Sequence, residues 1–323
     1  MTEEILHNLY RIEVPLKGNP LKALNAYFIR GGESDLLIDT GFRTEECFNA
    51  LKAGLNELHY DPERMDVMLT HFHADHSGLC DLIVDPSRHV FMQENEYAFE
   101  KTFPMVMMFN DVKQTYRKEG FIGDVTREPG RAEYIRADYT KDVYLTYKEG
   151  DVFEIGDYTL EPVHVPGHTP NNSMLYDRKH KLMFTGDHVL FDITPNIPIF
   201  PGTDNSLGDY LNSLKKAEQY DVEIAIPGHR KTGNYYERIA QLQKHHEERL
   251  EEVKRIIRDN PLCTAYEIAA QMQWRIHAKN WAEFPMTQKW FAMGECISHV
   301  RYLVYKGDIG SQIREDGIRV YSI

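Results

Sequence analysis

Short runs of β-branched and aromatic residues alternate with helical patterns along the first 90 residues of the chain. Apolar residues at every second position, or throughout a short run, fit the buried faces of a sheet. They predict strands over Ile5–Leu16, Leu24–Arg30, Asp35–Asp39 and Val67–Thr70. Helical patterns cover Thr44–His59 and Leu79–Val84. Residues 71–78 therefore form a strand-to-helix loop, and loops on rigid scaffolds are where catalytic groups are usually placed.

The alternation lapses between about residues 93 and 148, where the chain is rich in Tyr, Phe, Met, Lys and Glu. We interpret this segment, which includes the run Met105–Phe109, as a helical insertion. Two roles stay open for it. It packs within the fold or against a second subunit, or it forms a lid whose Met and aromatic side chains make an adaptable apolar wall for a substrate.

The strand pattern returns in the second half of the chain. It predicts strands over Tyr158–Val165, Ser173–Tyr176, Leu182–Thr185 and Val222–Ile226, and a helix over Leu207–Tyr220. Mixed strands with flanking helices in both halves indicate an α/β protein with a two-layered sheet core covered outside by helices. A long charged helix from about Tyr235 to Asn260 is expected to lead away from this core.

The last sixty residues have a different pattern. They predict helices over Thr264–Met272 and Met286–Lys306, then a two-stranded ribbon over Gly310–Ile323 that turns at Asp316-Gly317. Helices followed by a ribbon are typical of a winged helix. Because 323 residues exceed a single typical core, we expect a catalytic domain over 1–245 and a winged-helix-like domain over 246–323.

The amino-acid composition disfavours some classes of binding partner. The net charge of −13 argues against broad electrostatic attraction to phosphate backbones or anionic membranes, because both bind positively charged surfaces. The sequence predicts a cytoplasmic protein without signal peptide or membrane span. The four cysteines lie far apart, so we expect packing residues in a reducing compartment, with Cys80 near enough to the 71–76 loop to approach the site.

Four candidate metal ligands lie within six residues: His71, His73, Asp75 and His76. Burying three imidazoles and a carboxylate together without a cation would leave lone pairs and a charge unpaired. Neutral imidazole and carboxylate are ligands that zinc and similar ions take. The cluster therefore predicts a metal site.

A complete site needs further ligands from the same edge of the sheet. His168, Asp187 and His229 each follow a predicted strand, and a glycine directly precedes each of them. Glycine lets the backbone turn tightly enough to bring such a side chain inward. We therefore expect seven side chains, spread over some 160 positions, to converge.

At these residues the sequence resembles the metallo-beta-lactamase superfamily, whose signature reads His-x-His-x-Asp-His, then His, Asp and His at later strand ends. The resemblance covers residues 5–245 and implies a four-layer αββα sandwich. It implies two divalent ions, zinc being favoured over manganese or iron. In this reading His71, His73 and His168 bind one ion, Asp75, His76 and His229 bind the other, Asp187 bridges them, and Asp39 supports the ligand loop from behind.

The details of the resemblance bear on the reaction. Class B beta-lactamases often use a cysteine at the second metal, whereas this ligand set is similar to that of glyoxalase II, which argues against antibiotic hydrolysis. Flavodiiron relatives usually have Glu at the position of Ala74 and carry a flavodoxin domain, so a redox role is disfavoured.

Segments beyond the ligands resemble the subgroup with an associated winged helix, whose animal member is a beta-lactamase-like endoribonuclease. They are Asp192–Ile197, Gly208–Leu214, and His245-His246 with Arg249. Acidic and basic residues nearly balance in the tail, so packing or homodimer formation is favoured there over nucleic-acid binding.

The leading hypothesis is a hydrolase that attacks a small ester, thioester or lactone with a metal-bridging hydroxide. Asp75 and Asp187 are the candidate catalytic residues. His188 is a candidate for substrate contact or proton donation, or else structural, and Arg230 is an anion anchor or a surface cation. Two alternatives stay open: a ribonuclease or phosphodiesterase, and a non-enzymatic metal-dependent binding module.

Overall fold

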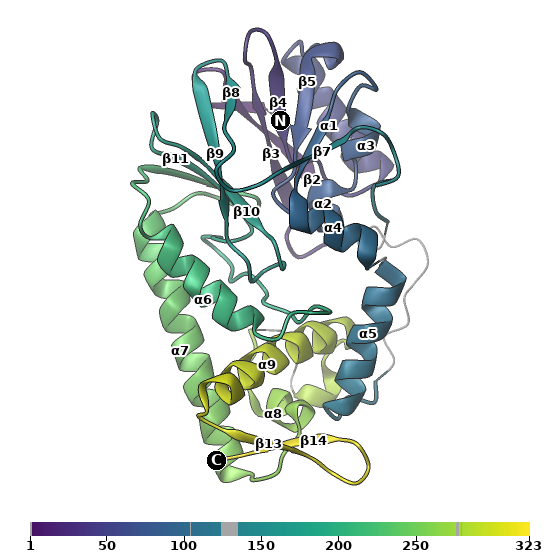
Figure 1. Ribbon diagram of the computed structural model, residues 1–323, viewed down its shortest axis with the longest axis vertical. Helices are drawn as coiled ribbons and strands as arrows, with labels where there is room; N and C mark the ends of the chain where they lie inside the picture. Colours follow the sequence, from purple (N-terminus) through teal and green to yellow (C-terminus); the bar gives the residue numbers. More distant parts are fainter. Residues whose placement is uncertain (1, 104, 124–134, 276–277, 279) are drawn as a thin grey trace.

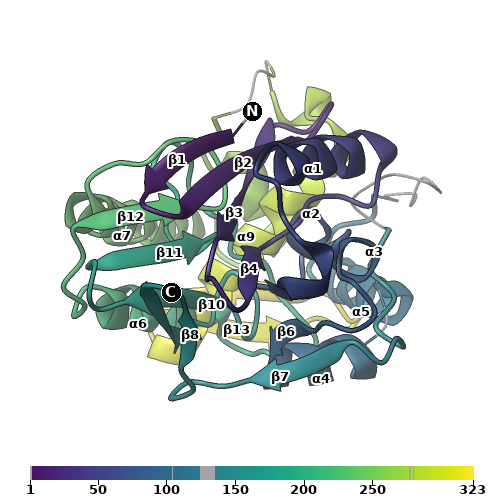
Figure 2. The same cartoon turned by 90° about the horizontal axis from the view of Figure 1, so that it is seen from above.

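The computed structural model describes residues 2–103, 105–123, 135–275, 278 and 280–323. Two sheets lie face to face (Figures 1 and 2). In spatial order the first contains β1 (Thr2–Leu6), β2 (Leu9–Pro15), β3 (Ala23–Ile29), β4 (Asp35–Ile38), β5 (Met65–Met68), β6 (Val90–Gln93) and β7 (Tyr144–Tyr147). The second contains β12 (Ile224–Pro227), β11 (Leu182–Gly186), β10 (Ser173–Asp177), β9 (Tyr158–His164) and β8 (Phe153–Ile155).

Strand direction brings the ligand loops to one edge of the molecule. The first sheet is antiparallel from β1 to β4 and parallel from β4 to β7. In the second sheet, β9 and β11 run in the same direction because each pairs antiparallel with β10, and β12 is parallel to β11. The carboxyl ends of β9, β11 and β12 therefore share one edge.

Both faces of the inner strands of each sheet are buried, which makes the fold four layers deep. On β3, Tyr27 and Ile29 face the second sheet, whereas Ala26 and Phe28 pack under the outer helices. This is the two-residue alternation of a strand. The first sheet is covered by α1 (Glu45–Glu57), α3 (Cys80–Ile83) and α4 (Glu94–Thr102), and the second by α6 (Ser206–Ala217) and the start of α7 (Tyr235–Asp259), with α9 (Met286–Lys306) packed on α6 and α7. The predicted αββα sandwich is confirmed.

The start of the chain differs from the prediction. The single strand expected over Ile5–Leu16 is two strands, β1 and β2, joined by a turn at His7-Asn8. Asn8 has a φ of 63°, a left-handed conformation that asparagine tolerates better than most residues. Its carbonyl oxygen accepts a hydrogen bond from the Arg30 N–H at 2.9 Å. The strand pattern resumes directly after this polar pair, at Leu9, so the prediction joined the two strands into one.

The insertion is helical only in part. It contains α4 and α5 (Met105–Lys118), but β7 lies within the predicted limits and forms the edge of the first sheet. Residues 124–134, also within those limits, lie outside the described residues. The Phe109 and Trp290 rings stack at 4.9 Å, and the Tyr116 hydroxyl donates to the Trp290 carbonyl at 3.0 Å. Thus α5 packs on α9 of the same chain, and the lid and subunit roles stay predictions.

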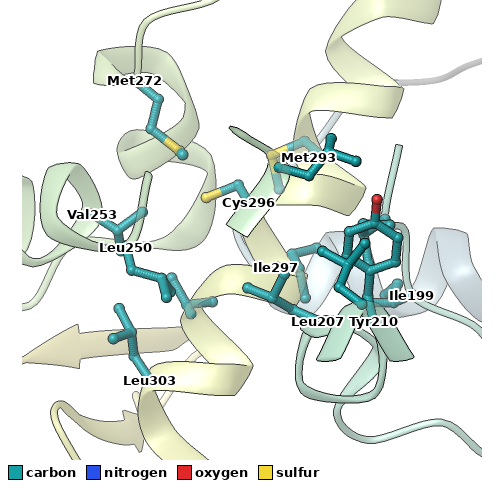
Figure 3. Close-up of a cluster of buried hydrophobic side chains, with 14 of the residues drawn as sticks. Ile199, Leu207, Tyr210, Leu250, Val253, Met272, Met293, Cys296, Ile297 and Leu303 are labelled. Atoms are coloured by element: carbon teal, nitrogen blue, oxygen red, sulfur yellow. The ribbon is translucent and has the colours of Figure 1, made fainter. Parts of the chain in front are cut away.

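The C-terminal elements share a core with the second sheet. They include α8 (Ala265–Gln271), β13 (Gly310–Ile313) and β14 (Arg319–Ser322), in the order predicted. Apolar side chains of α6, α7, α8 and α9 meet in one buried cluster (Figure 3). As predicted, α7 leads away from the two sheets (Figure 1), and its buried apolar residues, including Ile239 and Val253, pack in this cluster with α6, α8, α9 and β14. Residue 245 falls within α7, so the division at 245/246 stays a prediction, as does the winged helix.

The remaining short elements are α2 (Ala74–Ser77) and two 3₁₀ turns, Pro62–Arg64 and Trp281–Glu283. All four cysteines are buried and free, and Cys80 lies against the Tyr144 hydroxyl at 3.4 Å. Among the described helices, none combines the length and apolar character that crossing a bilayer requires.

Candidate metal centre

Three of the seven predicted ligands form a tight group. His71 and His73 come from the loop that joins β5 to α2, and His168 follows β9. The distance from His71 Nε2 to His73 Nδ1 is 3.0 Å, and that from His168 Nε2 to His73 Nδ1 is also 3.0 Å. All three nitrogens lie within 4.8 Å of one another. This spacing places three ring nitrogens around one common point.

A second group lies beside the first. His229 Nε2 is 3.2 Å from His76 Nε2 and 3.2 Å from Asp75 Oδ2. Asp187 lies between the groups. Its Oδ1 is 3.4 Å from His76 Nε2, and its Oδ2 is 3.6 Å from both His168 Nε2 and His229 Nε2. The structure therefore brings all seven predicted side chains together.

The outer ring nitrogens indicate that a cation belongs in the centre. In four of the histidines, Nδ1 lies 2.7–3.0 Å from an oxygen that can accept its proton. The pairs are His71 with Thr70 Oγ1, His76 with Asp39 Oδ2, His168 with the Asn196 carbonyl, and His229 with the Ala23 carbonyl. These partners assign the proton to Nδ1 and turn the Nε2 lone pair inward. Facing lone pairs repel one another, and a metal ion removes that repulsion.

The electrostatics of the two groups also fit cations. Burial, reinforced by the neighbouring histidines, lowers the pKa of His71 well below its ordinary value. Burial alone would lower the pKa of His76, but the carboxylates of Asp39 and Asp187 outweigh it and raise that pKa well above the ordinary value. Burial would raise the pKa of Asp187, yet the surrounding histidines hold it far below its usual range. Buried Asp187 Oδ1 also has no hydrogen-bond partner. The first group thus supplies neutral ligands, and the second requires positive charge.

Asp39 holds the ligand loop from behind, as the sequence predicts. Its Oδ1 accepts a hydrogen bond from the Thr70 N–H at 2.9 Å, and its Oδ2 lies 2.8 Å from Thr70 Oγ1 and 2.7 Å from His76 Nδ1. The residue has a φ of 59°, a conformation that is costly outside glycine and persists only where the surroundings hold it. One carboxylate therefore fixes both the start of the loop and the orientation of a ligand ring.

The glycines before the later ligands are required by close contacts. Gly167 has a φ of 139°, and Gly186 has a φ of 48°. A Cβ atom on Gly228 would lie 2.7 Å from His76 Cε1 and 2.8 Å from Asp187 Oδ1. These distances are shorter than van der Waals contact, so the site tolerates no side chain at this position.

We expect Gly228→Ala to reduce bound metal and hydrolytic activity, each by about tenfold or more, because the added methyl displaces two ligands. The measurements are metal content by mass spectrometry and kcat/KM. Gly310→Ala is the control, since its Cβ would meet Ser322 Oγ at an ordinary 3.5 Å. Wild-type metal content in the Gly228 variant would show that this contact does not shape the site.

The two predicted substrate residues do not join the ligand cluster. His188 is fully buried, and its ring lies 5.0 Å from the ring of Tyr210, which favours its structural role. The Arg230 guanidinium donates to the Pro20 carbonyl, in the loop between β2 and β3. A role of Arg230 as an anion anchor stays a prediction.

Glu96 on α4 is a buried residue that sequence reasoning missed. Its carboxylate bonds to the backbone of Phe72 and to the hydroxyl of Thr169, each adjacent to a predicted ligand. Burial raises the pKa of Glu96 to about 7, although its hydrogen bonds, the one with Thr169 foremost, oppose this. No local pattern separates it from the other acidic residues of the insertion, so only the tertiary contacts reveal it.

Comparison with known proteins agrees with the geometry. Residues 21–229 match the family model of the metallo-beta-lactamase superfamily. The chain is 30% identical over 217 residues to the acyl-coenzyme A thioesterase MBLAC2 of Gallus gallus, covering 64% of this chain and 72% of that protein. It is 29% identical over 264 residues to the probable metallo-hydrolase YqjP of Bacillus subtilis, covering 76% of this chain and 79% of the relative.

Two solved structures resemble the whole chain. A beta-lactamase domain protein from Burkholderia ambifaria superposes with a TM-score of 0.82 at 26% identity, covering 99% of this chain and 93% of that one. A metallo-beta-lactamase family protein from Thermus thermophilus has a TM-score of 0.81 at 24% identity and covers 99% of both chains. The C-terminal elements therefore belong to the shared fold.

Proposed function

Since this chain belongs to the metallo-beta-lactamase superfamily, a family of metal-dependent hydrolases, we propose that it holds two divalent ions and hydrolyses a small thioester. The observation that carries the proposal is the position of Asp187, whose two oxygens face both groups of histidines. One ion would be held by His71, His73 and His168, and the other by Asp75, His76 and His229, with Asp187 shared. Zinc suits this set of imidazoles and carboxylates, as do manganese and iron.

Two such ions would supply a nucleophilic water at neutral pH and polarise the carbonyl of the substrate. The chain itself orients the reactants. Ionised Asp187 would accept a hydrogen bond from the attacking water and direct its lone pair toward the carbonyl carbon. Asp75, whose pKa lies at about 2 because hydrogen bonding and charge from His229 outweigh its burial, also stays ionised. Both carboxylates therefore keep their ligand and orienting roles across the physiological pH range.

A thioester suits this site because its leaving group needs little help from an acid. Water adds to the carbonyl carbon, the C–S bond breaks, and the two protons of the water pass to the solvent. The products are a carboxylate and a thiolate, whose conjugate acid has a pKa of about 8.5. Four of the site histidines have their outer nitrogen engaged by an oxygen acceptor, so they are poorly placed to donate a proton. The names of the thioesterase relatives support the same substrate class.

The test is a substrate panel with the zinc-loaded protein: an acyl-coenzyme A, a nitrophenyl ester, a lactone, a nitrophenyl phosphodiester and single-stranded RNA. We expect kcat/KM for the thioester to exceed that for any phosphodiester by at least about tenfold, or about 1.4 kcal/mol. The same preparation after chelation is the control. Cleavage of RNA and phosphodiesters without thioester turnover would favour the ribonuclease alternative, and metal binding without any turnover would favour a binding module.

A further inference from the structure

Glu96 forms a bridge between two loops that are far apart in the sequence. It lies in the first turn of α4 and is 0% exposed. Its Oε1 accepts hydrogen bonds from the Phe72 N–H at 3.1 Å and from the Thr169 hydroxyl at 2.7 Å. The Glu96 N–H in turn donates to the Gln93 side chain at 2.8 Å, which fixes the start of the helix.

The two partners of Glu96 flank one complete group of ligands. Phe72 lies between His71 and His73, and Thr169 directly follows His168. A single carboxylate oxygen thus connects the two loops that supply all three imidazoles of the first group. The donor at Phe72 is a backbone N–H. The hydrogen bond to Glu96 therefore constrains the path of the loop backbone itself.

The surroundings make this bridge stiff. The Phe72 ring stacks on Phe99 at 5.6 Å and contacts Phe200 edge-on at 5.7 Å. The Arg136 guanidinium lies 5.4 Å from the centre of the same ring and pairs with Glu100. Burying a carboxylate is costly unless its hydrogen bonds compensate, and Glu96 Oε2 has no partner. An ordinary packing position would carry an apolar residue, so the buried carboxyl group and its two hydrogen bonds indicate a positioning role.

We propose that Glu96 is a positioning residue that holds the His71, His73 and His168 imidazoles in register and thereby sets the affinity of that group for its ion. The proposal rests on the proposed two-metal site. It also gives the insertion a role in the chemistry, because α4 is the element that supplies Glu96. Partners that orient metal ligands from outside typically change metal affinity by about 10–100-fold when they are removed.

The experiment measures stepwise zinc affinity, by competition with a chromogenic chelator, together with kcat and KM in four variants. Glu96→Ala removes both hydrogen bonds, and Thr169→Val removes one of them. Glu96→Gln retains a carbonyl oxygen that can accept them. Glu119→Gln is the matched control, because Glu119 is also a buried carboxylate but accepts its hydrogen bond from the Tyr321 hydroxyl, away from both ligand loops.

For Glu96→Ala we expect one of the two zinc-binding steps to weaken at least about tenfold while the other changes less than about threefold. The kcat should fall because a smaller fraction of the protein holds the zinc ion bound in that step, and it should recover partly in excess zinc. Glu96→Gln should restore most of the affinity, and Thr169→Val should show a smaller loss in the same step. If Glu96→Ala does not fold, Thr169→Val decides the question: a loss confined to one zinc-binding step supports the positioning role, and wild-type affinity in both steps overturns it.

Wild-type zinc affinity in both Glu96→Ala and Thr169→Val would overturn the positioning role, as would an equal loss in Glu119→Gln. That result leaves the proposed function intact. Failure of the wild-type protein to bind zinc would instead overturn the two-metal site itself, so the two failures are distinguishable.

Discussion

Replacing Asp187 with alanine is expected to lower kcat/KM by at least about 10³-fold, which corresponds to about 4 kcal/mol of lost transition-state stabilisation. The reason is its central position. Its carboxylate lies within 3.6 Å of ring nitrogens from three histidines in both groups, so its removal takes a shared ligand from each ion. The measurements are thioester turnover, metal content per chain and circular dichroism to establish that the variant is folded.

Asp192→Ala is the control for this variant. Asp192 is the next aspartate along the chain, it is exposed, and no contact joins it to the ligand cluster among the residues that the structure describes. It should retain wild-type turnover. A folded Asp187→Ala protein that still hydrolyses thioesters within about tenfold of wild type would be incompatible with a shared-ligand role.

Removing the metal is expected to abolish turnover and to lower the melting temperature by about 5–10 °C. An ion present at 1,000 times its Kd stabilises the folded state by about 4 kcal/mol, and each kcal/mol moves Tm by about 2–4 °C in proteins of 150–250 residues, less in longer ones. Without ions, Asp75 and Asp187 are buried close together beside inward-facing lone pairs. The measurement is a thermal melt before and after chelation, with zinc added back to restore both properties.

The control for the melt uses a histidine outside the site. His180 lies in the β10–β11 turn and its Nδ1 is 2.8 Å from Asp177 Oδ1, so His180→Ala should keep the full zinc-dependent shift. His73→Ala should lose most of it. Identical melting of native and chelated wild-type protein, with turnover preserved, would show that the seven side chains do not hold a metal.

Prediction from sequence worked best where the signal was local. The strands β3, β4 and β9 to β11, and the helices α1, α6, α8 and α9, begin and end within a few residues of their expected limits. Their periodicity reflects the burial of each residue by its own strand or helix. The turn at Asn8 and the edge strand β7 were missed, because the strand pattern resumes directly after the turn and because β7 depends on pairing with β6.

The identity of the seven clustered side chains was determined by sequence alone. Four lie within six residues, and the other three each follow a glycine at a strand end. These ligand positions can be recognised from the sequence because the ends of strands on one sheet edge must lie close together.

The family resemblance already implied the division of these side chains into two groups around Asp187 and the support from Asp39. Only the tertiary structure revealed Glu96 as a further residue that holds the ligand loops. Glu96 and Thr169 are 73 positions apart, and α5 of the insertion packs on α9 near the end of the chain. Such contacts depend on how the sheets and the outer helices pack on one another. The spacing of residues along the sequence does not reveal this packing.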